Sequence, residues 1–316
     1  MRMSFVQTNL ANNIDASNAR AKLDAVAKKL IRHRIILAEI LKECVEEFEG
    51  YELPFIEKNC IVGDVRVDEV SVDQDMPEMI IGSNTEDASD VEGVIHFDLV
   101  FDAIVPKTKE MIRLIINVEI QVDMDPGYPL VTRAIYYLGR LISRQKGTVF
   151  IRSDYGKIRK VYSIWICPDP KKANKNSVVE YGFVQQKVFG EVHEAVRNYD
   201  KMKAIIISFN DEGMDSENDI IKLLSTLLST KQSVDRRKRI LEDDFHIPMT
   251  REIEEEVSEM CNLGYAVENI GVEKGVEMTR LTSIRNLMET LKFTSEQAMD
   301  ALKIPKEDQK KYEDKL

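Results

Sequence analysis

The chain has 316 residues, 43% of them hydrophobic and 31% charged, with a formal net charge of −11 at pH 7. This is the composition of a globular protein, and the negative charge excludes coating of nucleic acid through overall charge, although it allows a local basic groove. The sequence has no apolar run that could span a bilayer, no signal pattern and four widely separated cysteines. We therefore expect a cytoplasmic protein with no membrane partner, and neither a zinc site nor a disulfide framework.

Three parts are predicted along the chain. Residues 1–16 show no clear periodicity of apolar side chains, so we predict an N-terminal arm. Residues 17–48 have apolar side chains at helical spacing, with a break near His33, and strand patterns follow up to residue 210. From residue 211 to 316 the patterns are helical and end in a helical pair, in which Thr294 and Gln297 have capping-box spacing. This last part has no catalytic pattern, so we expect it to mediate interaction or homo-oligomerisation.

Residues 93–123 are predicted to form two long strands joined by the polar loop 106–110, because both halves are rich in Val, Ile and Phe with partial alternation. A hairpin centred between Thr108 and Lys109 gives paired residues whose numbers sum to 217. Asp98 is then opposite Glu119, and His96 is opposite Gln121.

Two carboxylates that face each other across neighbouring strands destabilise a sheet unless a cation, a shared proton or a basic side chain compensates. Mg²⁺ is a suitable cation, because it binds a few carboxylate oxygens and keeps several waters. The alternative is an exposed face on which Asp98 and Glu119 are merely solvated. The apolar flanks favour the metal site.

A helix is predicted from Leu130 to Arg144. Its apolar stripe consists of Val131, Ala134, Ile135, Leu138, Leu141 and Ile142, and its opposite side carries Arg133, Tyr137, Arg140 and Arg144. Basic residues continue to Lys160. Arginines interleaved with tyrosines suit phosphate contacts and base stacking, whereas salt bridges to the acidic stretch upstream are an equally good explanation. The basic run 236–239 could likewise contact nucleic acid, or it could pair with the acids Glu242, Asp243 and Asp244 that follow it. Further strands are predicted over residues 160–167, 178–190 and 203–209.

This order of elements, with Asp98 on one strand and Glu119-Ile120-Gln121 on the next, resembles the PD-(D/E)XK nuclease superfamily. More narrowly it is similar to bacterial PD-(D/E)XK nuclease family transposases, relatives of the recombination-promoting nucleases. The helix with Arg133 and Tyr137 and the GVEKG run before the terminal helical pair also match that group. The resemblance implies an α/β fold with a restriction-endonuclease-like core, in which helices flank a mixed central sheet, plus an all-helical C-terminal region.

The resemblance also implies the chemistry of a DNA endonuclease linked to transposition or recombination. Mg²⁺, or Mn²⁺, would be held by Asp98, Glu119 and the carbonyl oxygen of Ile120. Gln121 stands where many superfamily members have a catalytic lysine; a glutamine orients water but supplies no positive charge. Lys107, Lys109 and Arg133 are the candidates for that charge, and the sequence does not choose among them.

Two other hypotheses remain open at this level. One is a catalytically inactive descendant that binds DNA or protein through the basic helix, with Arg133, Tyr137, Arg140 and Arg144 as its contacts, and through the helical C-terminal region. The other is a structural oligomer whose hairpin carboxylates pair with arginines such as Arg133.

Overall fold

A computed structural model describes residues 9–66, 69–71, 94–96, 99–118, 128–168, 175–313 and 315–316. The chain forms two compact units, one comprising Ala21–Asn262 and the other combining the N-terminal residues up to Arg20 with Leu263–Leu316. The helical residues 211–316 are thus shared between the two units. None of the described helices is long and apolar enough to cross a membrane.

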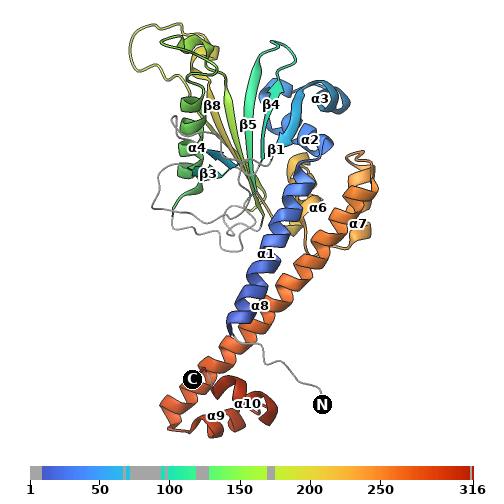
Figure 1. The fold of residues 1–316 in the computed structure, drawn as a ribbon, viewed down its shortest axis with the longest axis vertical. Helices are drawn as coiled ribbons and strands as arrows, with labels where there is room; N and C mark the ends of the chain where they lie inside the picture. The colour runs from blue at the N-terminus through green and yellow to red at the C-terminus, as the bar shows by residue number, and fades with distance from the viewer. Residues whose placement is uncertain are drawn as a thin grey trace. The chain divides into compact units, whose positions relative to one another are not determined.

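The larger unit is built on a six-stranded mixed sheet (Figure 1). Its strands β5, β6 and β8 are parallel to one another, and the other neighbours are antiparallel. The α/β class predicted from the sequence is therefore confirmed. In spatial order the strands are β1 (Ile61–Arg66), β4 (Leu99–Ile104), β5 (Met111–Val118), β6 (Val161–Pro168), β8 (Met202–Phe209) and β7 (Ser177–Gly182).

The prediction of one long first strand in the hairpin is wrong for the N-terminal part of that strand. Val94–His96 forms a separate short strand, β3, which pairs antiparallel with β2 (Glu69–Ser71) in a two-stranded sheet. His96 is paired with Glu69 rather than with a residue of β5. The central hairpin of the large sheet consists of β4 and β5 alone.

The register of this hairpin differs by two residues from the expected one. Leu99 pairs with Ile116, and every described pair sums to 215 rather than 217. The cause is the turn: the amide of Val105 donates to the carbonyl of Glu110 at 2.8 Å, and Lys109 has a left-handed backbone with φ of 60°. The loop therefore contains residues 106–109 and is centred between Lys107 and Thr108. A two-residue shift keeps every side chain on its predicted face.

Helices cover both faces of the sheet. The predicted helix over 130–144 is confirmed as α4 (Leu130–Arg144), which packs on β6 and β8. Figure 1 shows α2 and α6 on the other side of the sheet from α4. Strand β6 is buried from Val161 to Cys167, as expected of a central parallel strand covered on both faces.

The break expected near His33 is confirmed, because α1 ends at Ile31 and α2 begins at Arg34. Gly264, Gly271 and Gly275 lie within one continuous helix, α8. The helices and 3-10 turns are α1 (Asn9–Ile31), α2 (Arg34–Cys44), η1 (Glu46–Phe48), α3 (Leu53–Asn59), α4, η2 (Tyr155–Lys157), α5 (Val196–Tyr199), η4 (Asp211–Asp215), α6 (Asp219–Leu228), α7 (Val234–Asp243), α8 (Arg251–Leu291), α9 (Ser295–Ala301) and α10 (Lys306–Glu313).

The smaller unit has its own core, formed where the end of α8 meets α9 and α10. Ile284, Ala298, Met299, Ile304 and Tyr312 are buried together there. The predicted capping box at the start of α9 is confirmed, since the Thr294 hydroxyl accepts from the Gln297 amide at 3.2 Å and the Gln297 side chain accepts from the Thr294 amide at 3.0 Å.

Candidate functional site

The predicted metal ligands Asp98, Glu119 and Ile120, together with Gln121, lie outside the described residues. The strands that lead to them are described. β4 begins at Leu99, directly after Asp98, and β5 ends at Val118, directly before Glu119. Because β4 and β5 are antiparallel and Leu99 pairs with Ile116, the start of β4 and the end of β5 lie at the same edge of the sheet. We refer to the place where β4 begins and β5 ends as the acidic edge.

Arg133, in the first turns of α4, reaches over strand β6. Its guanidinium carbon lies 5.5 Å from the ring centre of Trp165 and 5.2 Å from that of Tyr137. Its Nε donates to the Tyr137 hydroxyl at 2.9 Å, and one terminal nitrogen donates to the Tyr128 hydroxyl at 3.2 Å. Aromatic faces and fixed hydrogen bonds hold a planar guanidinium in one orientation, which a lysine ammonium would not reproduce.

Trp165 connects this arginine to the acidic edge. It pairs in the parallel ladder with Asn117, the penultimate residue of β5. Its indole is fully buried and donates to the Ser163 hydroxyl at 2.9 Å, so the surface on which Arg133 rests is rigid. The guanidinium of Arg133 is therefore placed close to the end of β5.

The structure distinguishes the three cations that the sequence left open. Lys107 and Lys109 lie in the turn between β4 and β5, at the opposite end of these strands from the acidic edge. With about 3.3 Å per residue, the eight residues of β5 separate the two ends by roughly 20 Å. Only Arg133 of the three lies near the end of β5.

The four predicted nucleic-acid contacts on α4 are not equivalent. Tyr137 was expected on the solvent side, but it is 5% exposed and packs on Trp165 with ring centres 5.5 Å apart. Ile135 was expected in the core, but it is 57% exposed. The buried stripe is therefore rotated toward the Arg133 side of the helix, where the ring of Tyr137 packs on the indole of Trp165. Arg133, Arg140 and Arg144 are all partly buried at the margin of this stripe.

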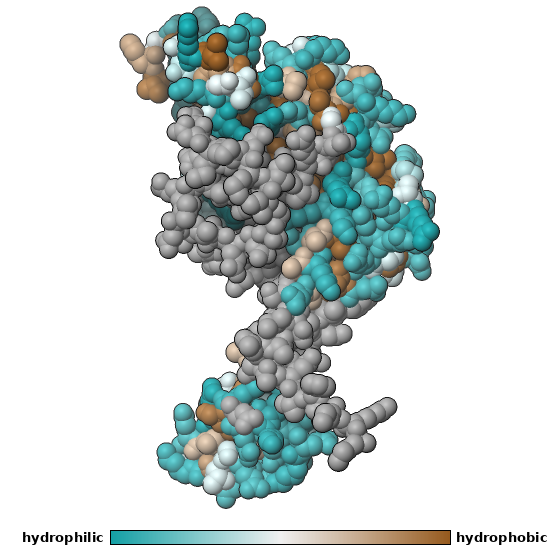
Figure 2. All heavy atoms as spheres, viewed as in Figure 1, coloured by the Kyte–Doolittle hydropathy of each residue, from teal (hydrophilic) through white to brown (hydrophobic). Residues whose placement is uncertain are grey.

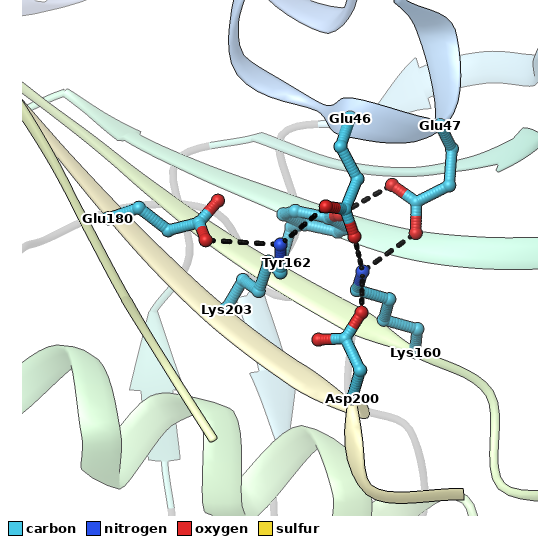
Figure 3. A network of polar contacts seen from close by, with 7 residues as sticks. All are labelled: Glu46, Glu47, Lys160, Tyr162, Glu180, Asp200 and Lys203. Atoms are coloured by element: carbon cyan, nitrogen blue, oxygen red, sulfur yellow. Dashed lines mark hydrogen bonds and ion pairs between the residues drawn. The ribbon is translucent and has the colours of Figure 1, made fainter. Parts of the chain in front are cut away.

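The basic stretch after α4 also divides into two kinds of residue. Lys146, Arg152 and Lys157 are exposed, with Tyr155 among them at 62% exposure. Lys160, in contrast, is buried in a cluster of carboxylates (Figure 3). Its ammonium donates to Glu46 at 2.7 Å, Glu47 at 2.8 Å and Asp200 at 2.5 Å.

The cluster around Lys160 extends to a second lysine. Lys203, on the neighbouring strand β8, contacts Glu46 at 3.0 Å and Glu180 at 3.1 Å, and the Tyr162 hydroxyl donates to Glu47 at 2.5 Å (Figure 3). We call these seven residues the lysine cluster: Glu46, Glu47, Lys160, Tyr162, Glu180, Asp200 and Lys203.

Ionisation in the lysine cluster is tuned by burial and pairing. Burial alone lowers the pKa of Lys160, but the hydrogen bonds that it donates to Asp200, Glu46 and Glu47 outweigh burial and raise that pKa. Burial raises the pKa of Glu46, but bonds from Lys160 and Lys203 dominate and lower it to about 2. The carboxylates of Glu46, Glu47 and Asp200 lie close enough to share a metal ion, yet the Lys160 ammonium already contacts all three. We interpret this cluster as structural.

A third polar group lies where α1 and α2 are joined. His33 Nε2 is 2.7 Å from the Glu256 carboxylate, and Glu252, one turn earlier on α8, completes a His-Glu-Glu group with metal-ligating spacing. Arg32 lies 3.9 Å from Glu252. A metal or a chain of ion pairs would equally satisfy these acids, and Mg²⁺ is not specifically indicated.

Three residues of the basic run 236–239 are bound to other parts of the protein. Arg237 is fully buried and donates to the carbonyls of Thr226 at 2.6 Å and Val257 at 3.1 Å. Arg236 pairs with Asp215, and Lys238 pairs with Glu254. These three side chains are bound to other elements of the larger unit and not to residues 242–244, whereas Arg239 is exposed.

Comparison with known proteins adds no relative: no family profile, curated protein or solved structure matches this chain. Trp165, Tyr128 and the lysine cluster were not identified as site residues from the sequence. Trp165 is the only tryptophan and stands in the middle of a strongly apolar strand pattern, which indicates burial but not a contact with an arginine 32 residues earlier.

Proposed function

We propose that the chain is a metal-dependent DNA endonuclease associated with transposition or recombination, with its site at the acidic edge. The observation that carries the proposal is the arrangement of β4, β5, α4 and β6. An antiparallel hairpin is followed by a helix and a strand parallel to β5, and the acids expected to bind the metal directly flank the two adjoining strand ends. A restriction-endonuclease-like core has this order of elements.

In this proposal Asp98, Glu119 and the Ile120 carbonyl hold Mg²⁺ or Mn²⁺. When bound, the ion lowers the pKa of a water and stabilises charge on the phosphate. Gln121 orients the water. Arg133 supplies the positive charge that a glutamine lacks, because its guanidinium is held near the end of β5 and is planar enough to contact two phosphate oxygens.

Two features fit the metal. The antiparallel register brings the two strand ends together, and oxygen donors of the kind found in Asp98, Glu119 and Ile120 are those that Mg²⁺ prefers. A fixed cation beside such a site is also consistent with a polyanionic substrate. Because the formal net charge is −11, such an attraction would come from local cations such as Arg133 and not from the overall charge of the protein.

A catalytically inactive DNA-binding module is the second candidate. The exposed Lys146, Arg152 and Lys157, with the exposed ring of Tyr155, favour it, since they offer phosphate contacts and a stacking surface away from the acidic edge. Such a module would bind DNA with a steep salt dependence and would not cut it.

Nicking of supercoiled plasmid with Mg²⁺ or Mn²⁺, measured beside DNA binding, separates the two candidates. We expect Asp98→Ala and Glu119→Ala each to lower nicking by about 100-fold or more while DNA is still bound. Asp154→Ala is the matched control, because this acid is exposed and pairs only locally with Lys157 at 2.7 Å. Activity that survives both site substitutions would reject the site, and binding without nicking by the wild type would favour the module.

A further inference from the structure

A loop after the edge strand β7 exposes large apolar side chains. Phe183, Val184, Val188, Phe189 and Val192 are 60%, 84%, 93%, 95% and 65% exposed. Figure 2 shows hydrophobic side chains projecting at the upper left, where the yellow loop of Figure 1 lies. We call residues 183–192 the apolar arm. Monomeric soluble proteins rarely expose apolar side chains so completely in one continuous segment, so this arm indicates an interaction surface.

The sequence of the arm and its observed conformation disagree. The pattern predicts a strand over 178–190, but β7 ends at Gly182. The backbone amides of residues 183–194 make no backbone hydrogen bond to any other described residue. β7 itself is the outermost of the six described strands of the sheet. A Pro-free segment with strand propensity and unpaired amides beside this outermost strand is suited to pairing with another extended chain.

The sequence of the arm indicates which chain would pair with it. Phe183-Val184-Gln185-Gln186-Lys187-Val188-Phe189 has the same apolar pattern in both directions about Gln186. Such a segment is complementary to itself when two copies run antiparallel, which is the requirement for a two-fold interface. We propose that residues 183–189 pair antiparallel with the same residues of a second copy of this chain, centred on Gln186, and so form a homodimer.

Each contact of this pairing is favourable. Phe183 lies opposite Phe189 of the second copy, twice by symmetry, and Val184 lies opposite Val188. Aromatic and β-branched cross-strand pairs are among those that stabilise sheets. Lys187 lies opposite the neutral Gln185, so no like charges meet, and within one chain it already pairs with Glu191.

The exposed apolar area of the arm approaches that of one side of a specific interface. Two phenylalanines and three valines with these exposures present on the order of 600 Å² of apolar surface per copy, against about 800 Å² for one side of a standard interface. The adjoining Val178, Val179 and Tyr181 of β7 are each about 40% exposed and extend the surface. The arm is nearly uncharged overall, which does not favour nucleic acid as its partner.

Sedimentation equilibrium of the full chain tests the proposal. We expect a reversible dimer whose dissociation constant rises by about 100-fold or more in Phe183→Ser/Phe189→Ser, because large aromatic side chains dominate such interfaces. At concentrations well below the wild-type dissociation constant, where both proteins are monomeric, the unfolding midpoint should be the same, since these rings are exposed within one copy. Ile135→Ser and Ile151→Ser are matched controls, as both side chains are similarly exposed outside the arm and should leave the dimer intact.

Disulfide trapping tests the register. Two copies centred on Gln186 bring their Gln186 Cα atoms to about 5 Å, within disulfide reach, so Gln186→Cys should form a disulfide-linked dimer on mild oxidation. Gln185→Cys is the control, because its counterpart in the second copy lies diagonally at about 8 Å and should react far more slowly.

Three results would overturn the proposal: a wild type that remains monomeric up to about 100 μM, a dimer that survives loss of both phenylalanines, or equal trapping at 185 and 186. A monomer in which the double substitution abolishes DNA binding would assign the arm to nucleic acid instead. None of these measurements depends on nuclease activity, so the proposed function and the dimer can fail separately.

Discussion

The cations at the two ends of the central strands have different surroundings. At the acidic edge the cation of Arg133 rests on the rings of Tyr137 and Trp165 and is held by tyrosine hydroxyls. At the other end of β6, the cation of Lys160 is enclosed by three carboxylates. The ammonium of Lys160 is committed to structure by the acids around it, whereas the guanidinium of Arg133 lies on aromatic rings near the end of β5, where the proposed nuclease would use it. Similar basic residues in one stretch of sequence thus have different roles.

The largest expected effect comes from removing the cation of the lysine cluster. Lys160→Met should lower the free energy of unfolding by about 3 kcal/mol, because it leaves Glu46, Glu47 and Asp200 facing each other with their shared partner gone. Chemical denaturation measures the loss. Lys157→Met is the matched control, since this lysine is exposed and pairs only with Asp154; its effect should stay within about 0.5 kcal/mol. Equal losses in the two variants would show that the lysine cluster contributes no more to the free energy of unfolding than an exposed ion pair does.

The next effect concerns the acidic edge. Arg133→Lys should lower kcat of plasmid nicking by about 10- to 100-fold, since a lysine keeps the charge but cannot stack on Trp165 and donate to Tyr137 and Tyr128 together. Thermal unfolding should change little by comparison. Lys107→Ala/Lys109→Ala should leave kcat within about twofold, because both residues lie roughly 20 Å away. If the hairpin variant loses as much activity as Arg133→Lys, the assignment of the charge to Arg133 is wrong.

Local patterns in the sequence predicted the elements well. Helix α4 was predicted to the residue, and strands β6 and β8 within one, because their apolar periodicity is long and regular. The hairpin was predicted correctly, but its predicted register was wrong by two residues. That register follows from the left-handed backbone at Lys109, and nothing in the pattern shows that a lysine will adopt it.

Contacts between distant residues were not predictable in the same way. The stripe of α4 can be drawn through Ile135 or through Tyr137, and Trp165 on another element decides in favour of Tyr137. Lys160 looked like part of a basic surface, because its partner Glu46 lies 114 residues earlier. The sequence therefore indicated which residues were charged, and only the fold showed which charges are neutralised.

The smallest expected effect is a pH dependence at the lysine cluster. The carboxyl of Glu46 titrates at about 2 in the folded chain against an ordinary value of 4.5, because Lys160 and Lys203 stabilise its charged form. A lowered folded pKa gives stability that is complete above about pH 4.5 and is lost as the pH falls toward 2. Since the side chain is half exposed, solvent screening limits this contribution to about 1 kcal/mol or less. Glu46→Gln should therefore flatten the fall in unfolding free energy between pH 4.5 and 2, whereas Glu49→Gln, an exposed neighbour, should leave that slope unchanged; urea denaturation at a series of pH values measures both. A Glu46→Gln slope as steep as the wild type would mean that the other two carboxylates bound to Lys160, those of Glu47 and Asp200, carry the pairing at this end of the sheet.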